Sequence, residues 1–593
     1  MVSSQQPRAF VALDLGSATT SVALVGNLAG RWRLIAYTGA PCRVEADALI
    51  AGLLRRIHDA DPLMLEELGA SQPIDPEALA LAWPRFVAST TPPRRLAVLA
   101  ATKRQRHRLE TVASRSGWKV AGGSSDDTDP VDLERLILSP DTNAVLLGAD
   151  RSPGGDEKRD LPDLAAMVAA ATRLRPELMV ILAGGAAAYE SIYFEPPASP
   201  APIAAPATED VAPTGEFGED GQAPPAAASA AEPTTEPASG GVDAGADMPV
   251  AHVLLAPDAE AGSPAGSSLQ QVLEGLRAEP GDSRLNIARS IASLSYVLDR
   301  SVEAVEVGYQ GGLMARSEPF GHGHFSIVSS HACPVDGAFA PADASDDVID
   351  GLTAWSTQLI DRHRLTDRLM DLRVAPWGNC EGDGATFRLA AAKAAIARLV
   401  AATPDIAERP MPELIVAAGG ILSSLPASVV ALALADLVRR SGVTQIASDP
   451  ARLLGPLGTI EDEGERRKLL ASLADDILLP MATLVVPAGI KPGKSAGELK
   501  LKGSGYVSEI ELHPGAIQVV DLPSGRSATA ELNFRDAVTL GTRGHRFSMP
   551  VSGGLVGLLL DLRDVPMRIS ERPETRRAVL EAWQKGMWPE VDE

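Results

Sequence analysis

Apolar and polar residues alternate along the chain in short runs, which predict strands and helices in turn. Three apolar runs near the start, Ala9–Leu15, 21–25 and 32–37, are separated by turn-forming residues at 16–20 and 27–30, which predicts three strands joined by tight turns. Further strands are predicted at 95–102, 144–147 and 179–182, and helices up to residue 116 and at 161–175. Such alternation is typical of a mainly parallel sheet with helices on its faces.

A second series of strands and helices begins near residue 252. Strands are predicted at 252–255, Val302–Val307, 313–316 and 413–417, and helices at 269–276, 284–298, 384–402 and 428–441. The strand, glycine turn and strand near residue 306 are of the same kind as those near residue 14. This repetition predicts a duplicated α/β domain in which each half begins with a hairpin.

Two segments differ in texture from this α/β pattern. Residues 196–249 contain eleven prolines, nine acidic residues and no Lys or Arg, which predicts a disordered acidic insertion that acts as a spacer or binds a partner. From residue 496, short β-rich runs spaced by HPG, PSG and TRG predict a small barrel or sandwich closed by a helix at 574–585. The expected domains are therefore 8–195, 196–249, 250–495 and 496–593.

Charge and cysteine content narrow the function classes. A formal net charge of −23 over 593 residues disfavours binding to nucleic acid or anionic lipid. Three widely spaced cysteines without a CxxC pair favour a reducing compartment, and no basic-then-apolar leader or membrane-spanning run is found. The sequence thus predicts a cytoplasmic protein, and it does not indicate an oligomeric state.

The stretch VALDLGSATTSVALV, residues 11–25, places polar residues between two apolar runs. A glycine turn with hydroxyl side chains presents backbone N–H groups to an anion. Asp14 would repel a phosphate unless Mg²⁺ lay between them, so Asp14, Ser17, Thr19 and Thr20 suggest a metal–phosphate corner. A plain Gly-Ser hairpin is the open alternative.

The stretch DLGSATTSVAL resembles the first phosphate loop of the actin-like ATPases, and the whole series of motifs resembles the MutL proteins (GlmL) associated with adenosylcobalamin-dependent glutamate mutase. That family is distinct from mismatch-repair MutL. The further matches, in order, are VILAGGAAAYES with Ala183, Gly184 and Gly185, EVGYQGGLM at 306–314, CEGDGATFR with Glu381, Gly382, Asp383 and Arg388, and PELIVAAGGILSS with Gly419 and Gly420. They span roughly residues 9–460.

The resemblance implies a duplicated actin-like (ribonuclease H-like) fold that binds ATP and Mg²⁺ in the cleft between two lobes. It assigns phosphate, metal and nucleoside contacts to Asp14, Gly16, Ser17, Thr19, Thr20, Glu306, Gly308, Gly311, Gly312, Gly419 and Gly420, with Asp14 and Glu306 as the catalytic and metal-binding residues. It also implies an accessory or chaperone-like role toward a protein client, a cobalamin-dependent mutase.

Two departures from the family pattern bear on turnover. Ser21 stands where the family often has a phosphate-binding lysine, seven residues after the first aspartate. In the second loop Glu306 replaces an aspartate, and Leu313 and Met314 stand where Thr-Asp is expected. A longer carboxylate side chain shifts a metal-bound water relative to the γ-phosphate. The sequence therefore leaves open a slow ATPase or a pseudo-ATPase scaffold that binds proteins.

A second polar constellation lies at HGHFSIVSSHAC, residues 322–333. On two paired strands, His322 and His324 could face His331 and Cys333 and hold a metal. A polar loop beside the second hairpin is the alternative interpretation, and the sequence does not decide between them.

Overall fold

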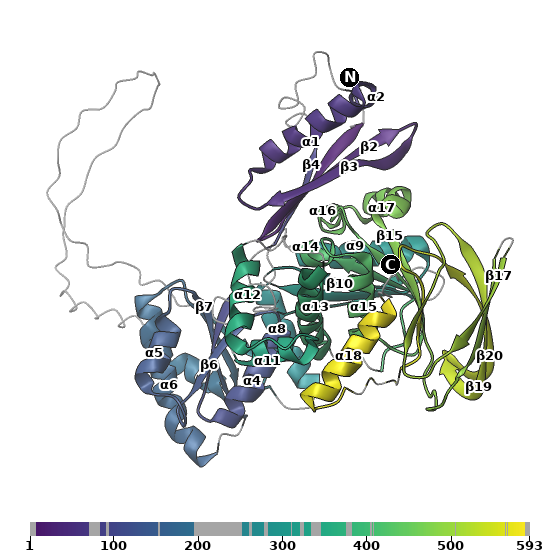
Figure 1. The fold of residues 1–593 in the computed structure, drawn as a ribbon. Helices are drawn as coiled ribbons and strands as arrows, with labels where there is room; N and C mark the ends of the chain where they lie inside the picture. The colour runs from purple at the N-terminus through teal and green to yellow at the C-terminus, as the bar shows by residue number, and fades with distance from the viewer. Residues whose placement is uncertain are drawn as a thin grey trace, which may run out of the picture.

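The computed structural model describes residues 8–69, 83–90, 94–151, 154–194, 252–259, 264–277, 283–309, 311–320, 325–333, 346–374, 382–403, 406, 408–503, 506–563, 565, 567 and 569–587 (Figure 1). It is a mixed α/β structure with both parallel and antiparallel sheets. The insertion expected at 196–249 lies outside the described residues. Among those residues, none of the helices combines the length and the apolarity that crossing a membrane requires.

An N-terminal sheet is formed by the first strands of the chain in the order β3-β2-β1-β4. Its elements are β1 (Ala9–Leu15), β2 (Thr19–Leu28), β3 (Arg31–Pro41) and β4 (Arg85–Ser89), with helices α1 (Ala46–Ala60) and α2 (Pro62–Glu67). One face packs on Ile50, Leu53, Leu54 and Ile57, which lie along one side of α1. The opposite face, with Phe10 and Ala12, belongs to a core shared with later helices.

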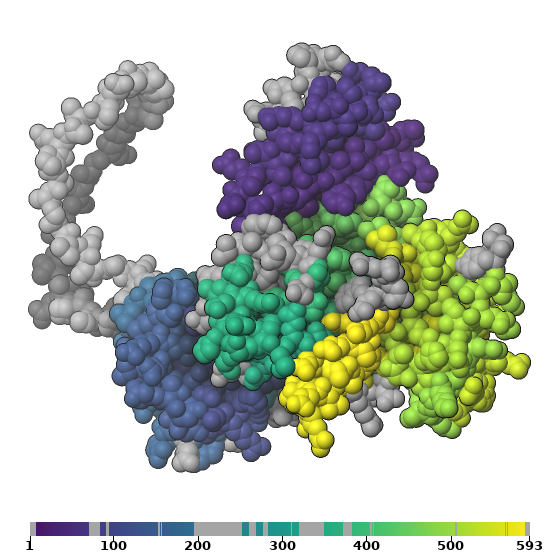
Figure 2. All heavy atoms as spheres, in the orientation of Figure 1, coloured from purple at the N-terminus to yellow at the C-terminus, as the bar shows by residue number. Residues whose placement is uncertain are grey.

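The parallel sheet is a separate unit with the order β6-β5-β7-β8-β9. It contains β5 (Arg95–Ala100), β6 (Lys119–Ser124), β7 (Thr142–Ala149), β8 (Met179–Gly184), β9 (Val253–Ala256), α4 (Lys103–Arg115), α5 (Pro130–Leu138), α6 (Gly155–Leu174), the 3₁₀ helix η1 (Gly185–Tyr189), α7 (Glu190–Tyr193) and α8 (Pro264–Arg277). Figure 2 shows its residues, in blue, standing apart from the N-terminal sheet, in purple.

This parallel sheet crosses the boundary expected at residue 250. Strand β9 was expected to begin the second lobe, but it pairs in parallel with β8 of the preceding segment. Strands β1–β4 in turn do not join β5–β8, so the first segment contains two sheets where one was expected. An apolar run predicts a strand but does not identify its neighbours, which explains both differences.

The large sheet has eight strands in the order β12-β11-β10-β13-β14-β15-β21-β18. They are β10 (Val302–Val307), β11 (Gly312–Phe320), β12 (Phe325–Cys333), β13 (Leu414–Ala418), β14 (Gly442–Ser448), β15 (Leu479–Val486), β18 (Ile517–Val520) and β21 (Gly557–Asp561). The part β12-β11-β10-β13 repeats the N-terminal order β3-β2-β1-β4, with two antiparallel pairs and one parallel pair in each.

Helices cover both faces of the large sheet. They are α9 (Ser283–Leu298), α11 (Asp346–Trp355), α12 (Arg362–Val374), α13 (Gly382–Ala402), α14 (Gly419–Leu422), α15 (Ala427–Leu437), α16 (Leu454–Gly458), α17 (Glu463–Ile477) and α18 (Pro573–Met587). Val305 and Val307 of β10 pack with α13 and α15, whereas Val302 and Ala304 pack with α9, α16 and α17. The alternation follows from the two-residue period of a strand. In Figure 1, α16 and α17 lie between the N-terminal sheet and the large sheet.

The C-terminal sheet has the order β17-β16-β19-β20. Its strands are β16 (Gly497–Gly503), β17 (Tyr506–Leu512), β19 (Ser527–Leu540) and β20 (Thr542–Ser552). The expected closed domain 496–593 is not what the pairing shows, because β18 and β21 join the large sheet and α18 packs against β18. The C-terminal segment thus contributes to two sheets.

Candidate functional site

A cleft of about 310 Å³ lies where the N-terminal sheet and the large sheet meet. Its lining residues lie at or just beyond the carboxyl ends of β1, β4, β10, β13 and β14; examples are Asp14, Thr90, Glu306, Gly419 and Asp449. Loops beyond the carboxyl ends of parallel strands are the usual ligand sites of open α/β sheets. The position of this cleft therefore makes it the candidate site.

Two hairpin turns with the same geometry face this cleft. The amide of Gly16 donates to the carbonyl of Thr19 at 3.1 Å, and the amide of Gly308 donates to the carbonyl of Gly311 at 2.9 Å. The carboxylates of Asp14 and Glu306 each precede the turn glycine by two residues. Asp14 pairs with Ser21 and Glu306 with Leu313, which is the same register in both hairpins.

Most of the residues expected from the sequence line the cleft. Those that do are Asp14, Gly16, Ser17, Thr19, Glu306, Gly308, Gly419 and Gly420. Thr20, Gly311 and Gly312 are not in the lining. Thr20 is a buried ladder residue opposite Leu15, and a Cβ on Gly312 would lie 2.9 Å from Leu399 in the core. The functional roles of all eleven residues stay predictions.

Gly419 allows the two halves of the site to approach closely. Its φ is +89°, and a Cβ there would lie 2.6 Å from both Glu306 Oε1 and the carbonyl oxygen of Val307. A Cβ on the next residue, Gly420, would lie 3.1 Å from Thr19 Oγ1 of the first hairpin. Both glycines therefore lie beside the hairpin turns, and at Gly419 only a residue without a side chain fits.

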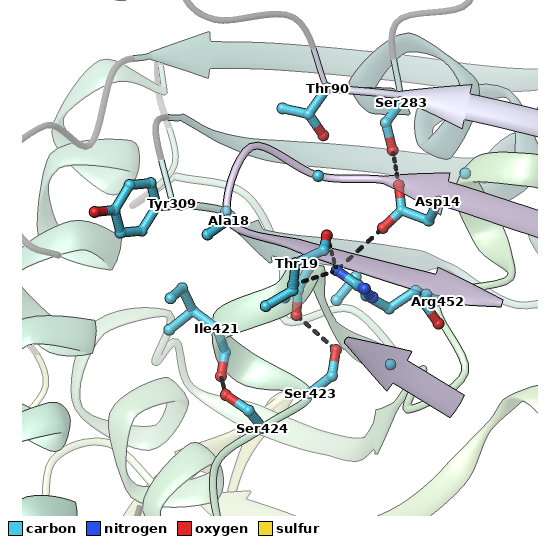
Figure 3. A pocket seen from close by; sticks show the side chains of 18 of the residues that line it. Asp14, Ala18, Thr19, Thr90, Ser283, Tyr309, Ile421, Ser423, Ser424 and Arg452 are labelled. Carbon is cyan, nitrogen blue, oxygen red and sulfur yellow. Dashed lines mark hydrogen bonds and ion pairs between the residues drawn. The ribbon is translucent and has the colours of Figure 1, made fainter. Parts of the chain in front are cut away.

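Asp14 is buried, and both of its carboxylate oxygens have partners. The hydroxyl of Ser283 donates to Oδ1 at 3.2 Å, and Arg452 Nη1 lies 3.4 Å from Oδ2 (Figure 3). Burial raises the pKa of Asp14, and the positive charge of Arg452 and the Ser283 hydrogen bond counter that shift. The carboxylate expected to hold a metal thus already has a positively charged guanidinium group beside it.

Arg452 and Asp449 are cleft residues that the sequence did not indicate. The guanidinium of Arg452 lies beside the first hairpin, and its Nη1 donates to Thr19 Oγ1 at 3.0 Å (Figure 3). Asp449 accepts the amides of Leu453 and Leu454 at 3.0 and 2.9 Å. Burial, with the nearby charge of Asp14, raises the pKa of Asp449 to about 6. The only sequence signal is an acidic residue directly after a buried strand.

Ser17 offers a hydroxyl group to the cleft. Its Oγ is buried and has no hydrogen-bond partner among the described residues. A buried hydroxyl without a partner costs roughly 1–3 kcal/mol, so such groups usually meet a ligand or water. We therefore expect a ligand or water to supply the hydrogen-bond partner of Ser17 Oγ.

Other sequence motifs do not reach the cleft. Gly184 ends β8 of the parallel sheet, Gly185 begins η1, and neither is in the lining. Glu381 lies outside the described residues. The possible metal cluster of His322, His324, His331 and Cys333 lies outside the described residues and side chains. Among the side chains that are described, no group of three or more His, Cys, Asp or Glu is placed to hold a metal.

After the turn of the second hairpin, apolar side chains stand at positions 313 and 314, where the sequence resemblance leads us to expect a hydroxyl group and a carboxylate. Leu313 and Met314 follow the turn and are buried in the two cores on opposite faces of β11. Neither side chain belongs to the cleft lining, which is completed on this side by Tyr309. The second hairpin therefore contributes a carboxylate, a glycine turn and an aromatic ring.

No family model and no curated protein matches the sequence. Among solved structures, nucleotide-free acetone carboxylase, from a study of ATP-dependent acetone carboxylation, matches with 10% identity and a TM-score of 0.27. The match covers 85% of this chain and 80% of that chain. Values this low decide nothing about the site, and the proposals below rest on the cleft itself.

Proposed function

We propose that the cleft binds the phosphates of a nucleotide, ATP according to the sequence resemblance, between two duplicated lobes. The observation that carries this proposal is the pair of glycine turns with one register, facing one cleft at the carboxyl ends of five strands. Repeated strand order in the two sheets supports the duplication. The Ser17 hydroxyl suits a phosphate oxygen, and glycine turns of this kind commonly bind anions.

The residues present do not fit a metal ion held by Asp14. Both carboxylate oxygens are occupied, one by a hydroxyl donor and the other by an arginine. We therefore derive no step through Mg²⁺ at this residue, although the resemblance assigns a metal to Asp14 and Glu306. Phosphate fits better, because it accepts hydrogen bonds from the same donors.

We further propose a binding switch rather than an efficient hydrolase. Leu313 and Met314 are buried and apolar. The second hairpin therefore lacks the Thr-Asp pair that the family resembled by the sequence has at these positions. Closure of two lobes around a nucleotide requires only that the closed state bind it more tightly. An accessory role toward a cobalamin-dependent mutase rests on the sequence resemblance alone, and co-purification from the native host would test it.

A second candidate, a pseudo-ATPase scaffold, is favoured by one observation. Arg452 joins the loop after β14 directly to Thr19 in the first hairpin. If the two halves are already fixed by such contacts, the cleft needs no nucleotide to hold its shape. Thermal unfolding with ATP separates the candidates, since a scaffold shows no shift in Tm.

Calorimetric titration of the full chain with ATP, ADP and adenosine tests nucleotide binding. We expect both nucleotides to bind and adenosine to bind at least tenfold more weakly, because phosphate contacts dominate. Ser17→Ala should weaken ATP binding about tenfold or more, the cost of a hydrogen bond to a charged group. Ser548→Ala, an exposed serine on β20, is the matched control. Absence of heat and of a Tm shift with either nucleotide would overturn the proposal.

A further inference from the structure

The backbone at Arg452 is held in a conformation that side chains rarely adopt. Its φ is +55°, and it is one of few residues other than glycine with a positive φ in the described chain. For a bulky residue this left-handed conformation costs roughly 1–2 kcal/mol. Strain of this kind persists when neighbouring contacts fix it, and it is concentrated at functional sites. The strained backbone at Arg452 therefore suggests a functional role for its side chain.

Contacts on both sides fix the loop that carries Arg452. The hydroxyl of Ser21 on β2 donates to the carbonyl of Ala451 at 3.1 Å. On the other side, the Asp449 carboxylate accepts the amides of Leu453 and Leu454 at the start of α16. These bonds place the guanidinium group at the first hairpin, where its exposed fraction is only 9%. The hydrogen bonds of this loop thus hold the Arg452 side chain at the cleft.

Ser21 lies at the position on β2 from which a basic side chain could reach the first turn. Proteins of the family that the sequence resembles often have a lysine there, directed at phosphate. In this chain the serine is 4% exposed and instead binds the loop before Arg452. Position 21 on β2 carries no charge in this chain, and Arg452 brings a positive charge to the same turn from the segment after β14, about 430 residues along the chain. Both routes bring a cation to the turn at Gly16.

The guanidinium group also changes what a phosphate requires. Arg452 Nη1 lies 3.4 Å from Asp14 Oδ2, so the acidic residue of the turn already has a counter-charge. A guanidinium offers five N–H donors in a plane and suits two phosphate oxygens at once. The guanidinium of Arg452 and the carboxylate of Asp14 therefore form an ion pair in the cleft.

From this geometry, and resting on the proposed function, we infer that Arg452 is the phosphate-binding cation of the cleft. It takes the place of the missing lysine, and it removes the need for a divalent metal between Asp14 and the phosphates. The ligand class is a nucleoside di- or triphosphate bound in its metal-free form. Arg452 then acts in binding and positioning, and no bond to it forms or breaks.

Titration of the full chain with ATP in EDTA and in excess Mg²⁺ tests this inference. Wild type should bind ATP in EDTA at least as tightly as Mg-ATP, because a cation is already present and free ATP carries more negative charge. Arg452→Gln should weaken binding in EDTA about 10- to 100-fold. In that variant Asp14 has no counter-charge, so added Mg²⁺ should restore at least fivefold of the affinity. A purely structural role would not produce this gain of metal dependence.

Controls separate binding from folding. Arg526→Gln changes the net charge equally at an exposed position outside the cleft lining and should leave both affinities unchanged. Arg452→Lys keeps the charge without the planar donors, and should lie between wild type and Arg452→Gln. This variant keeps the test decisive if Arg452→Gln shows a lowered Tm.

The possible failures can be told apart. Wild-type affinity that disappears in EDTA, or equal affinity in Arg452→Gln and wild type, overturns the assignment of Arg452 and leaves nucleotide binding standing. Wild type that binds no nucleotide in either buffer overturns the proposed function, and the inference that rests on it fails with it.

Discussion

Replacement of Gly419 by alanine tests whether the close approach of β13 and β10 maintains the cleft. A Cβ at this position would meet the Val307 carbonyl at 2.6 Å and its carbon at 2.8 Å. Backbone atoms of a paired strand cannot move aside as a flexible side chain can. Val307 is held in the ladder opposite Gly312, so the turn that begins α14 must shift instead.

Two terms set the expected loss of stability for Gly419→Ala. The φ of +89° costs an alanine roughly 1–2 kcal/mol, and forced displacement of packed atoms adds about 1–3 kcal/mol. The sum is about 2–5 kcal/mol. Unfolding entropy of about 2.1 cal/mol/K per residue then predicts a fall in Tm of at least about 2–4 °C, even if all 593 residues unfold together.

The neighbouring Gly420 provides the matched control. A Cβ there would approach only Arg452 Nη1 at 3.0 Å and Thr19 Oγ1 at 3.1 Å, which are ends of side chains. Gly420→Ala should therefore change stability by less than about 1 kcal/mol. Calorimetric melting and ATP titration of both variants decide the matter. Equal Tm values for Gly419→Ala and wild type would show that the described approach of the two strands is wrong.

Two further predictions concern buried charges. Asp436 pairs with Lys393 and Arg563 in the core, so Asp436→Ala should lower the free energy of unfolding by about 3–5 kcal/mol, whereas Lys502→Ala breaks an exposed pair and should cost under about 1 kcal/mol in denaturant titrations. Because burial raises the pKa of Asp449 to about 6, folding favours its protonated form and stability should rise as pH falls, by about 1 kcal/mol between pH 7 and 5. A Tm difference between pH 7 and 5 that is as large in Asp449→Asn as in wild type would contradict that assignment.

The sequence was sufficient to predict the bounds of strands that consist of a buried apolar run. Strands β1 and β10 have the bounds that were predicted, Ala9–Leu15 and Val302–Val307. Both are buried along nearly their whole length, and apolar residues fill six of seven positions in β1 and four of six in β10. By contrast α1 and α17 were not predicted. Each has many charged and polar residues on its exposed side, which obscures the apolar stripe.

Assignment of strands to sheets was beyond the sequence. The runs that form β9, β18 and β21 were recognised only as strands, and each joined a sheet other than the one expected. Backbone hydrogen bonding is the same for every partner strand. Packing between sheet faces and helices that are distant in the chain selects the partner of each strand. The pattern of a single sequence does not show which distant segments pack together.

The candidate site was predicted to the extent that it resides in local turns. Asp14, Gly16 and Glu306 stand out because a polar residue and a glycine interrupt an apolar run. Arg452 has no such local signal, since an arginine in a loop is ordinarily exposed. Its importance arises from contacts with Thr19 and Asp14, which the fold brings together.

The long separation between Ser21 and Ala451 has a consequence for synthesis. Their hydrogen bond spans 430 residues, and a ribosome adding about 5–20 residues per second needs roughly 20–90 s to make the intervening chain. During that interval the first hairpin emerges without the loop that completes its surroundings. A nascent polypeptide is consequently unable to assemble the cleft until most of its length has been translated.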